Sequence, residues 1–290
     1  NRGTIYKFNK DPGSLVVLRS LAMADGQQPQ CELVQSAAGA LFGTASIGGA
    51  QNFGTVYRLE ADGNGFSVLH SFTGGAAGQN PLSGLMIASD GGLYGTTPPL
   101  FGSFAGCIYR LNTDGTGFQA LKSFPLAGTG PKAPRAVLVE APDGRLYGSA
   151  LSGGAANQGV MFRIGRNGDG FEVLHEFGMS PGDGETPPAA FTAVGDGSFL
   201  GVTEAGGNGH GTVFRFDPVD VRMRIGLTPI TAELGWPASS TVATLELTSG
   251  VGGFDWQQSG SAVTRVGDEN RAAVPRSTTG QFFRVHRAWP

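Results

Sequence analysis

The stretch "GTVYRL" at residues 54–59 decides the fold, because close copies of it recur through the chain. The copies read "GTIYKF" at 3, "GCIYRL" at 106, "GVMFRI" at 159 and "GTVFRF" at 211. Their leading glycines are 51, 52, 53 and 52 residues apart. Self-similarity at such a period is typical of repeat architectures, in which each repeat is one supersecondary unit. The spacing therefore predicts an array of repeats, each of about 52 residues.

Each repeat contains four short apolar runs. The first follows a proline, as in "PLSGLMIAS" (81–89), and the second reads "LYGTT" (93–97). The hexamer is the third run, and the fourth resembles "FQALKSF" (118–124). Asp-Gly and Gly-Gly turns separate these runs, and such turns accept the positive φ that tight hairpins require. Four meandering strands per repeat are typical of a β-propeller blade, so the fold class is predicted to be all-β.

The repeats divide the chain into two parts. Residues 1–218 are predicted to form a β-propeller of four to five four-stranded blades. The amino-terminal pair of strands (3–8 and 14–21) lacks the first two strands of a blade, and the run "VDVRMRIG" (219–226) is a doubtful fourth strand at the other end. The period stops after Pro218, and residues 227–290 contain five alternating runs. These runs predict a small β-sandwich module.

Composition excludes several classes of function. The 49 glycines are about twice the usual share, which fits many tight turns. The net charge of −3 argues against nucleic acid or an anionic membrane as a partner. Membrane insertion is not expected, because no apolar stretch approaches the roughly 20 residues that span a bilayer. Cys31 and Cys107 are compatible with either a disulfide or buried free thiols.

The sequence contains no known catalytic motif in which the reactive residues stand at the required spacing. The four histidines are isolated from one another, and zinc-binding, G-x-S-x-G and Walker patterns are absent from the sequence. The turn aspartates Asp62, Asp114 and Asp169 stand alone, which favours hairpin turns over calcium loops. Glu32, Glu140 and Glu204 remain candidates for a carboxylate pair brought together by the fold. We expect neither an enzyme nor a bound cofactor or metal.

A basic residue recurs near the end of every hexamer, at Lys7, Arg58, Arg110, Arg163 and Arg215. One interpretation is a ring of cations that binds an anionic surface polymer. The other is that each cation pairs with a nearby acid while its stem packs along apolar surface. The negative net charge favours the second interpretation.

The unit "GTVYRLEADGNGFSVLHSFTGG" followed by "PLSGLMIASDGGLYGTT" resembles the Gloeo/Verruco-type (GloVer) tandem repeat. The resemblance covers residues 3–216, and the tail resembles the short β module that accompanies such repeats. It implies a propeller-like fold in a bacterial protein located outside the cell or at its surface. It implies no catalytic residues.

Three functions follow as expectations. The first is a non-enzymatic binding or adhesion scaffold whose partner is a cell-surface or extracellular polymer. The second is a self-assembling structural protein, a head-to-tail filament or surface layer, because the incomplete amino-terminal half-blade leaves an open edge for another copy of the chain. The third is a propeller lyase or glycosidase, which would need two acids or a histidine pair in one pocket.

Overall fold

The computed structural model describes residues 2–11, 13–99, 104–188, 190–194 and 198–216, together with seven strands between residues 224 and 287. Regular structure in this part is strand, apart from one 3-10 turn, η1 (Gly75–Ala77). The fold is therefore all-β, as the turn pattern predicted. The chain forms two compact units, of which the first contains Asn1–Glu140, Arg145–Thr192 and Gly201–Phe214 and the second contains Ala141–Gly144, Ala193–Leu200 and Arg215–Pro290.

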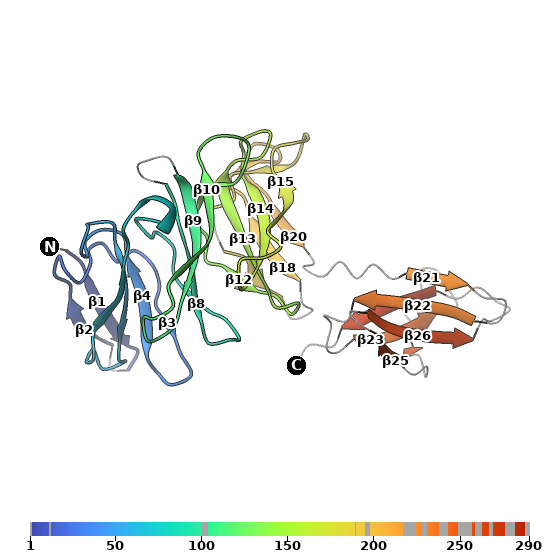
Figure 1. Ribbon diagram of the computed structural model, residues 1–290, viewed down its shortest axis with the longest axis horizontal. Helices are drawn as coiled ribbons and strands as arrows, with labels where there is room; N and C mark the ends of the chain where they lie inside the picture. Colours follow the sequence, from blue (N-terminus) through green and yellow to red (C-terminus); the bar gives the residue numbers. More distant parts are fainter. Residues whose placement is uncertain are drawn as a thin grey trace. The chain divides into compact units, whose positions relative to one another are not determined.

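The repeat region is a succession of antiparallel meanders that follow one another in chain order (Figure 1). The first hairpin consists of β1 (Thr4–Asn9) and β2 (Ser14–Ser20). Blade 2 consists of β3 (Val34–Gln35), β4 (Leu41–Ala45), β5 (Thr55–Leu59) and β6 (Ser67–Ser71). Blade 3 consists of β7 (Met86–Ile87), β8 (Leu93–Thr97), β9 (Phe104–Leu111) and β10 (Gln119–Pro125).

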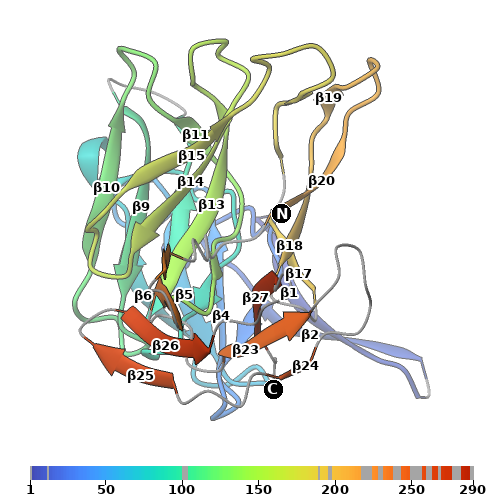
Figure 2. The same cartoon turned by 90° about the vertical axis from the view of Figure 1, so that its right-hand side faces the viewer.

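Two further sheets complete the repeat region. In blade 4, β13, β14 and β15 lie side by side (Figure 2), and its strands are β11 (Lys132–Pro134), β12 (Val139–Glu140), β13 (Arg145–Ser152), β14 (Val160–Gly165) and β15 (Glu172–Glu176). The described strands of blade 5 are β17 (Thr192–Ala193), β18 (Phe199–Val202) and β20 (Val213–Phe216). Beside them, β16 (Gly184–Glu185) pairs with β19 (Ala205–Gly206). These are β-propeller blades, and each hexamer supplies the third strand, as the repeat predicted.

The first strand of each full blade is shorter than the sequence pattern suggested. In blade 3 only Met86–Ile87 forms a ladder, although the apolar run begins at Pro81. That proline instead lies against the preceding blade, where a Cβ on Gly54 would be 2.6 Å from Pro81 Cδ. Gly54 also has a φ of 94°, which favours glycine. The glycine that opens the hexamer is therefore required by contact with the next blade.

The core of the array lies between blades. From the second repeat onward, the aromatic residue in the middle of the hexamer packs on the end of the fourth strand of the preceding blade. Ring pairs of this kind are Phe72–Tyr109 at 5.1 Å, Phe124–Phe162 at 6.2 Å and Phe177–Phe214 at 5.4 Å. Leu21 and Tyr57 share a buried cluster in the same arrangement. Each blade thus buries its face against its neighbour, as expected of a stacked repeat.

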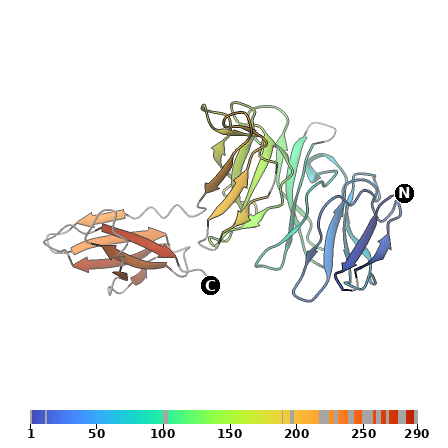
Figure 3. The same cartoon turned by 180° about the vertical axis from the view of Figure 1, so that it is seen from behind.

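The second unit contains the two antiparallel sheets of the small β-sandwich (Figure 3). One has the order β21 (Arg224–Leu227), β22 (Thr231–Pro237), β26 (Glu269–Pro275) and β25 (Val263–Val266). The other has the order β24 (Gln257–Gln258), β23 (Ala243–Thr248) and β27 (Phe282–Arg287). The described end of the doubtful run 219–226 lies in β21, which pairs with β22 and so belongs to this module, not to blade 5.

Candidate interaction surface

Alternation along the hexamer gives each blade two different faces. Successive side chains of a strand point to opposite sides of its sheet. The third residue of a hexamer therefore faces the following blade, while the fourth faces the preceding one. Three buried clusters show the resulting pairs, which are Ile5 with Tyr57, Val56 with Tyr109, and Ile108 with Phe162. The same contact between repeats thus occurs three times in one chain.

The first hairpin exposes the face that blades 2, 3 and 4 bury. Four of its apolar side chains form what we call the hairpin face. They are Tyr6 (60% exposed), Phe8 (60%), Leu15 (61%) and Val17 (52%). The equivalent third-strand positions in blade 2, Tyr57 and Leu59, and in blade 3, Tyr109 and Leu111, are fully buried. The equivalent fourth-strand positions in blade 3, Phe118 and Ala120, pack against the blade 2 and 3 cluster. The hairpin face is therefore the uncovered half of an inter-blade contact.

Blade 5 exposes the opposite half. Val213 is the third residue of its hexamer and is 75% exposed, whereas Val56 and Ile108 at the same position are fully buried. Val202 on β18 is 43% exposed, whereas its equivalents Thr44 and Thr96 are buried. We call Val202 and Val213 the end face. Gly211, which opens this hexamer, has Thr203 and Glu204 as its described neighbours in place of the proline ring that covers Gly54.

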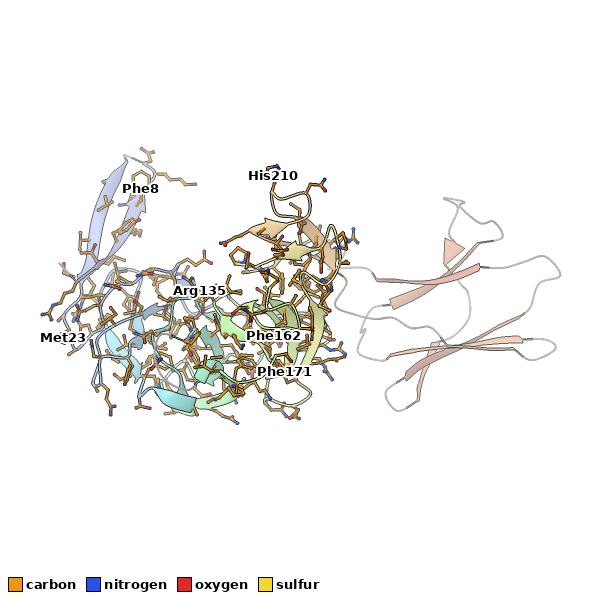
Figure 4. The ribbon with its side chains drawn as sticks, turned by 90° about the horizontal axis from the view of Figure 1, so that it is seen from above. Phe8, Met23, Arg135, Phe162, Phe171 and His210 are labelled. Carbon is orange, nitrogen blue, oxygen red and sulfur yellow. The ribbon has the colours of Figure 1, made fainter. Side chains whose placement is uncertain are left out.

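The two faces belong to opposite ends of the first unit. Figure 4 shows the first hairpin with Phe8 projecting at one end of this unit, while the loop with His210 lies at the other end. Phe162, in blade 4, lies between them in the array. The hairpin face and the end face are therefore separate surfaces on the same chain.

The five repeated cations of the hexamers lie one on each third strand. Arg58 pairs with Glu60, Arg110 lies 3.7 Å from Asp90, and Arg163 lies 2.6 Å from Glu172. Each of these acids belongs to the same blade as its arginine. Lys7 and Arg215 have exposed side chains. The ion pairs are local, and those with solvent-exposed partners stabilise a protein by about 1 kcal/mol or less.

The basic residues of the fourth strands take part in contacts between blades. The Arg19 guanidinium lies 4.4 Å from the centre of the Phe66 ring, and Lys122 Nζ lies 5.0 Å from that of Phe171. His70 stacks on Phe118 with ring centres 3.7 Å apart. Burial lowers the pKa of His70, so its neutral form is favoured. In every case the aromatic partner belongs to the next blade.

The carboxylates considered for catalysis lie in different settings. Glu140 accepts hydrogen bonds from Ser89 N at 2.6 Å and Ser89 Oγ at 2.9 Å, and it lies 3.4 Å from Arg166. Glu32 and Glu204 are exposed. Among the described residues, no three His, Cys, Asp or Glu side chains gather as metal ligands would. Cys31 and Cys107 are free thiols, so the disulfide alternative is wrong, and burial raises the pKa of Cys107 to about 12.

An open pocket of about 800 Å³ lies between blades 2 and 3. It is lined by small residues of the turn at 36–40 and by Phe42, Arg58 and Asp114. No helix in the described part of the chain has the length and apolar character needed to cross a membrane.

Sequence reasoning identified the incomplete half-blade but missed the end face. The strand count of the first repeat indicated an open edge, which is where the hairpin face lies. No comparable signal marks the end face in the sequence, because the hexamer at 211–216 is followed by the run 219–226 and by Pro237 at the usual distance. The individual exposed residues follow only from the register between blades.

Comparison with solved structures finds proteins of low similarity to this chain. A protein described as a gluconolactonase has 14% identity and a TM-score of 0.45, covering 94% of this chain and 81% of its own. A chain of a nidogen–laminin complex has 12% identity and a TM-score of 0.46, covering 80% and 82%. TolB from Acinetobacter baumannii has 12% identity and a TM-score of 0.42, covering 98% and 61%. Structural similarity at this level of identity does not assign an activity to this chain.

No curated protein matches the sequence. The family profile described as the Gloeobacter/Verrucomicrobia repeat matches residues 1–106 and 75–245, which is most of the chain. The resemblance seen in the hexamers is thereby confirmed, and the chain belongs to the Gloeobacter/Verrucomicrobia repeat family.

Proposed function

We propose that this chain is a non-enzymatic structural protein that acts outside the cell or at its surface by associating with further copies of itself. The observation that carries the proposal is the hairpin face, where Tyr6, Phe8, Leu15 and Val17 are more than half exposed. Contiguous exposed apolar side chains of this kind mark interaction sites. Their equivalents elsewhere in the chain are covered by another blade, so a repeat of the same kind is the partner that fits.

The test is the molar mass of the purified chain, measured by size exclusion with light scattering over a range of concentrations. Association predicts species heavier than the 29.8 kDa monomer, with a mass that increases with concentration. The double variant Tyr6→Lys/Phe8→Lys should remain monomeric, because burying two unpaired ammonium groups is costly. Val16→Lys is the matched control, since Val16 is exposed on the opposite side of the same hairpin and should leave association unchanged. A wild-type chain of 29.8 kDa at every concentration would refute the proposal.

A second candidate function is a scaffold that binds an extracellular polymer. The pocket of about 800 Å³ between blades 2 and 3 favours it, because Phe42 offers an apolar wall and Arg58 and Asp114 offer polar groups at the same pocket. Calorimetric titration with anionic and neutral polysaccharides tests this function. Arg58→Ala should weaken the binding of an anionic polysaccharide. Arg163→Ala, the equivalent change in another blade, should leave that binding unchanged. Equal effects of the two variants on binding would argue against this pocket as the binding site.

A further inference from the structure

The hairpin face and the end face are the two halves of one repeated contact. Inside the chain, the third residue of one hexamer packs with the fourth residue of the next, as Val56 does with Tyr109. At the ends of the array, Val213 has the role of Val56 and Tyr6 has the role of Tyr109. Both are exposed, at 75% and 60%.

Resting on the proposed self-association, we propose that copies join head to tail, with the hairpin face of one copy on the end face of the next. The joint continues the inter-blade contact across two chains, and Val213 packs against Tyr6 of the second copy. Such a contact is heterologous, because two different surfaces meet. It generates a ring if the rotation between copies closes and a filament if it does not.

Chemistry also favours this pairing over contact between two identical hairpin faces. In each internal contact an aromatic ring lies against a smaller aliphatic side chain, as Phe162 does against Ile108. Val213 and Val202 are aliphatic side chains that are exposed at the end of the array, as is Leu200 on β18. Two hairpin faces would instead bring Tyr6, Phe8, Leu15 and Val17 of both copies together, whereas the internal contacts pair the third residue of one hexamer with the fourth residue of the next.

Two variants, each with one damaged face, test the head-to-tail joint. Tyr6→Lys/Phe8→Lys removes the hairpin face and keeps the end face, while Val213→Lys does the reverse. Val213 is 75% exposed, so its replacement leaves the core of blade 5 intact. Asn208→Lys adds the same charge to an exposed position of the nearby loop and is the matched control. Circular dichroism establishes that each variant is folded before its mass is measured.

The head-to-tail joint predicts that each damaged variant alone is a monomer. Mixed in equal amounts, the two should form a species of twice 29.8 kDa and no larger, because only one intact pair of faces remains. Asn208→Lys should assemble like the wild type. Association of Val213→Lys alone would overturn the inference by showing contact between identical hairpin faces, and so would a mixture that stays monomeric. A monomeric wild type would instead refute the proposed self-association itself.

Discussion

In blades 2 to 5, a glycine of the second strand lies beneath the aromatic ring of the third strand. Gly148 is paired with Phe162 across the two strands, and its backbone does not need a positive φ. A Cβ at Gly148 would lie 2.7 Å from Leu138 Cδ2 and 2.8 Å from Phe162 Cζ. Both side chains are buried, so neither has free space into which it can move.

Gly148→Ala should therefore lower the free energy of unfolding by about 1–3 kcal/mol, which is the usual cost of overpacking a core. Urea denaturation measures the change. Gly130→Ala is the control, because a Cβ there meets no atom within 4 Å and the φ of Gly130 is not in the left-handed region. The control should change the free energy of unfolding by no more than about 0.5 kcal/mol. Equal stability of both variants would contradict the crowding of Gly148.

His70 gives the array a pH dependence that can be tested. Its ring is stacked on Phe118, its Nε2 is buried without a hydrogen-bond partner, and burial lowers its pKa. An unfolded histidine takes up a proton near pH 6.5, whereas the folded one resists protonation until a lower pH. The free energy of unfolding contributed by this site is thus fully present above about pH 6.5 and is lost as the pH falls toward the folded pKa.

His70→Gln should remove this part of the pH dependence. Urea unfolding at about pH 7.5 and about pH 5.5, on either side of the ordinary histidine pKa, compares the two proteins. The wild type should lose more stability than the variant between the two conditions. If both lose the same amount, protonation of His70 is not coupled to folding.

At the scale of elements, the first hairpin has the weakest support in the array. It consists of two strands and packs on blade 2 through one side, where Ile5 and Leu21 are buried. Blade 3, by contrast, has covered faces on both sides, because it contributes to the cluster with blade 2 and to the cluster with blade 4. Local opening costs least where few apolar contacts must be broken.

Hydrogen exchange should therefore be fastest in β1 and β2 and slowest in β9 and β14 when the protein is dilute. Exchange in β1 and β2 should slow as the concentration rises, because association covers the hairpin face. The Tyr6→Lys/Phe8→Lys variant supplies the comparison and should show no such slowing. Protection of β1 and β2 equal to that of β9 in dilute protein would contradict the open hairpin.

The sequence was sufficient to predict the third and second strands of each blade, because their apolar runs and Asp-Gly turns are local signals. It was insufficient for the first strand, since Pro81 and its equivalents pack on the preceding blade and only two residues such as Met86–Ile87 pair. Hydrogen bonds between side chains of different repeats could not be predicted from the sequence either. Glu140 meets Ser89 across 51 residues, and only the rotation between neighbouring blades brings them together.

The interaction surface was partly predictable for the same reason. A missing pair of strands can be counted, so the half-blade at residues 3–21 was visible in the repeat. Which side chains it exposes depends on strand register, because a shift by one residue would turn Tyr6 inward and Ile5 outward. The recurring cations drew attention in the sequence by their spacing, yet Arg110 and Arg163 have acids of their own blade beside them.

At the scale of the whole molecule, the two units carry different chromophores. All five tyrosines lie in the repeats, between Tyr6 and Tyr147, whereas the three tryptophans lie at Trp236, Trp256 and Trp289. Trp256 and Trp289 lie outside the described residues. Tyrosine absorbance therefore follows unfolding of the repeats, and tryptophan fluorescence follows the carboxy-terminal region.

Association through the hairpin and end faces should raise the thermal midpoint of the tyrosine signal as protein concentration increases. A partner that binds the folded state alone adds about 2.7 kcal/mol at a hundredfold excess over its dissociation constant. The tryptophan signal should respond less, because both faces belong to the repeats. In Tyr6→Lys/Phe8→Lys the tyrosine midpoint should no longer depend on concentration, while Val16→Lys should retain the dependence. A wild-type tyrosine midpoint that is the same at all concentrations would mean that association does not stabilise the array.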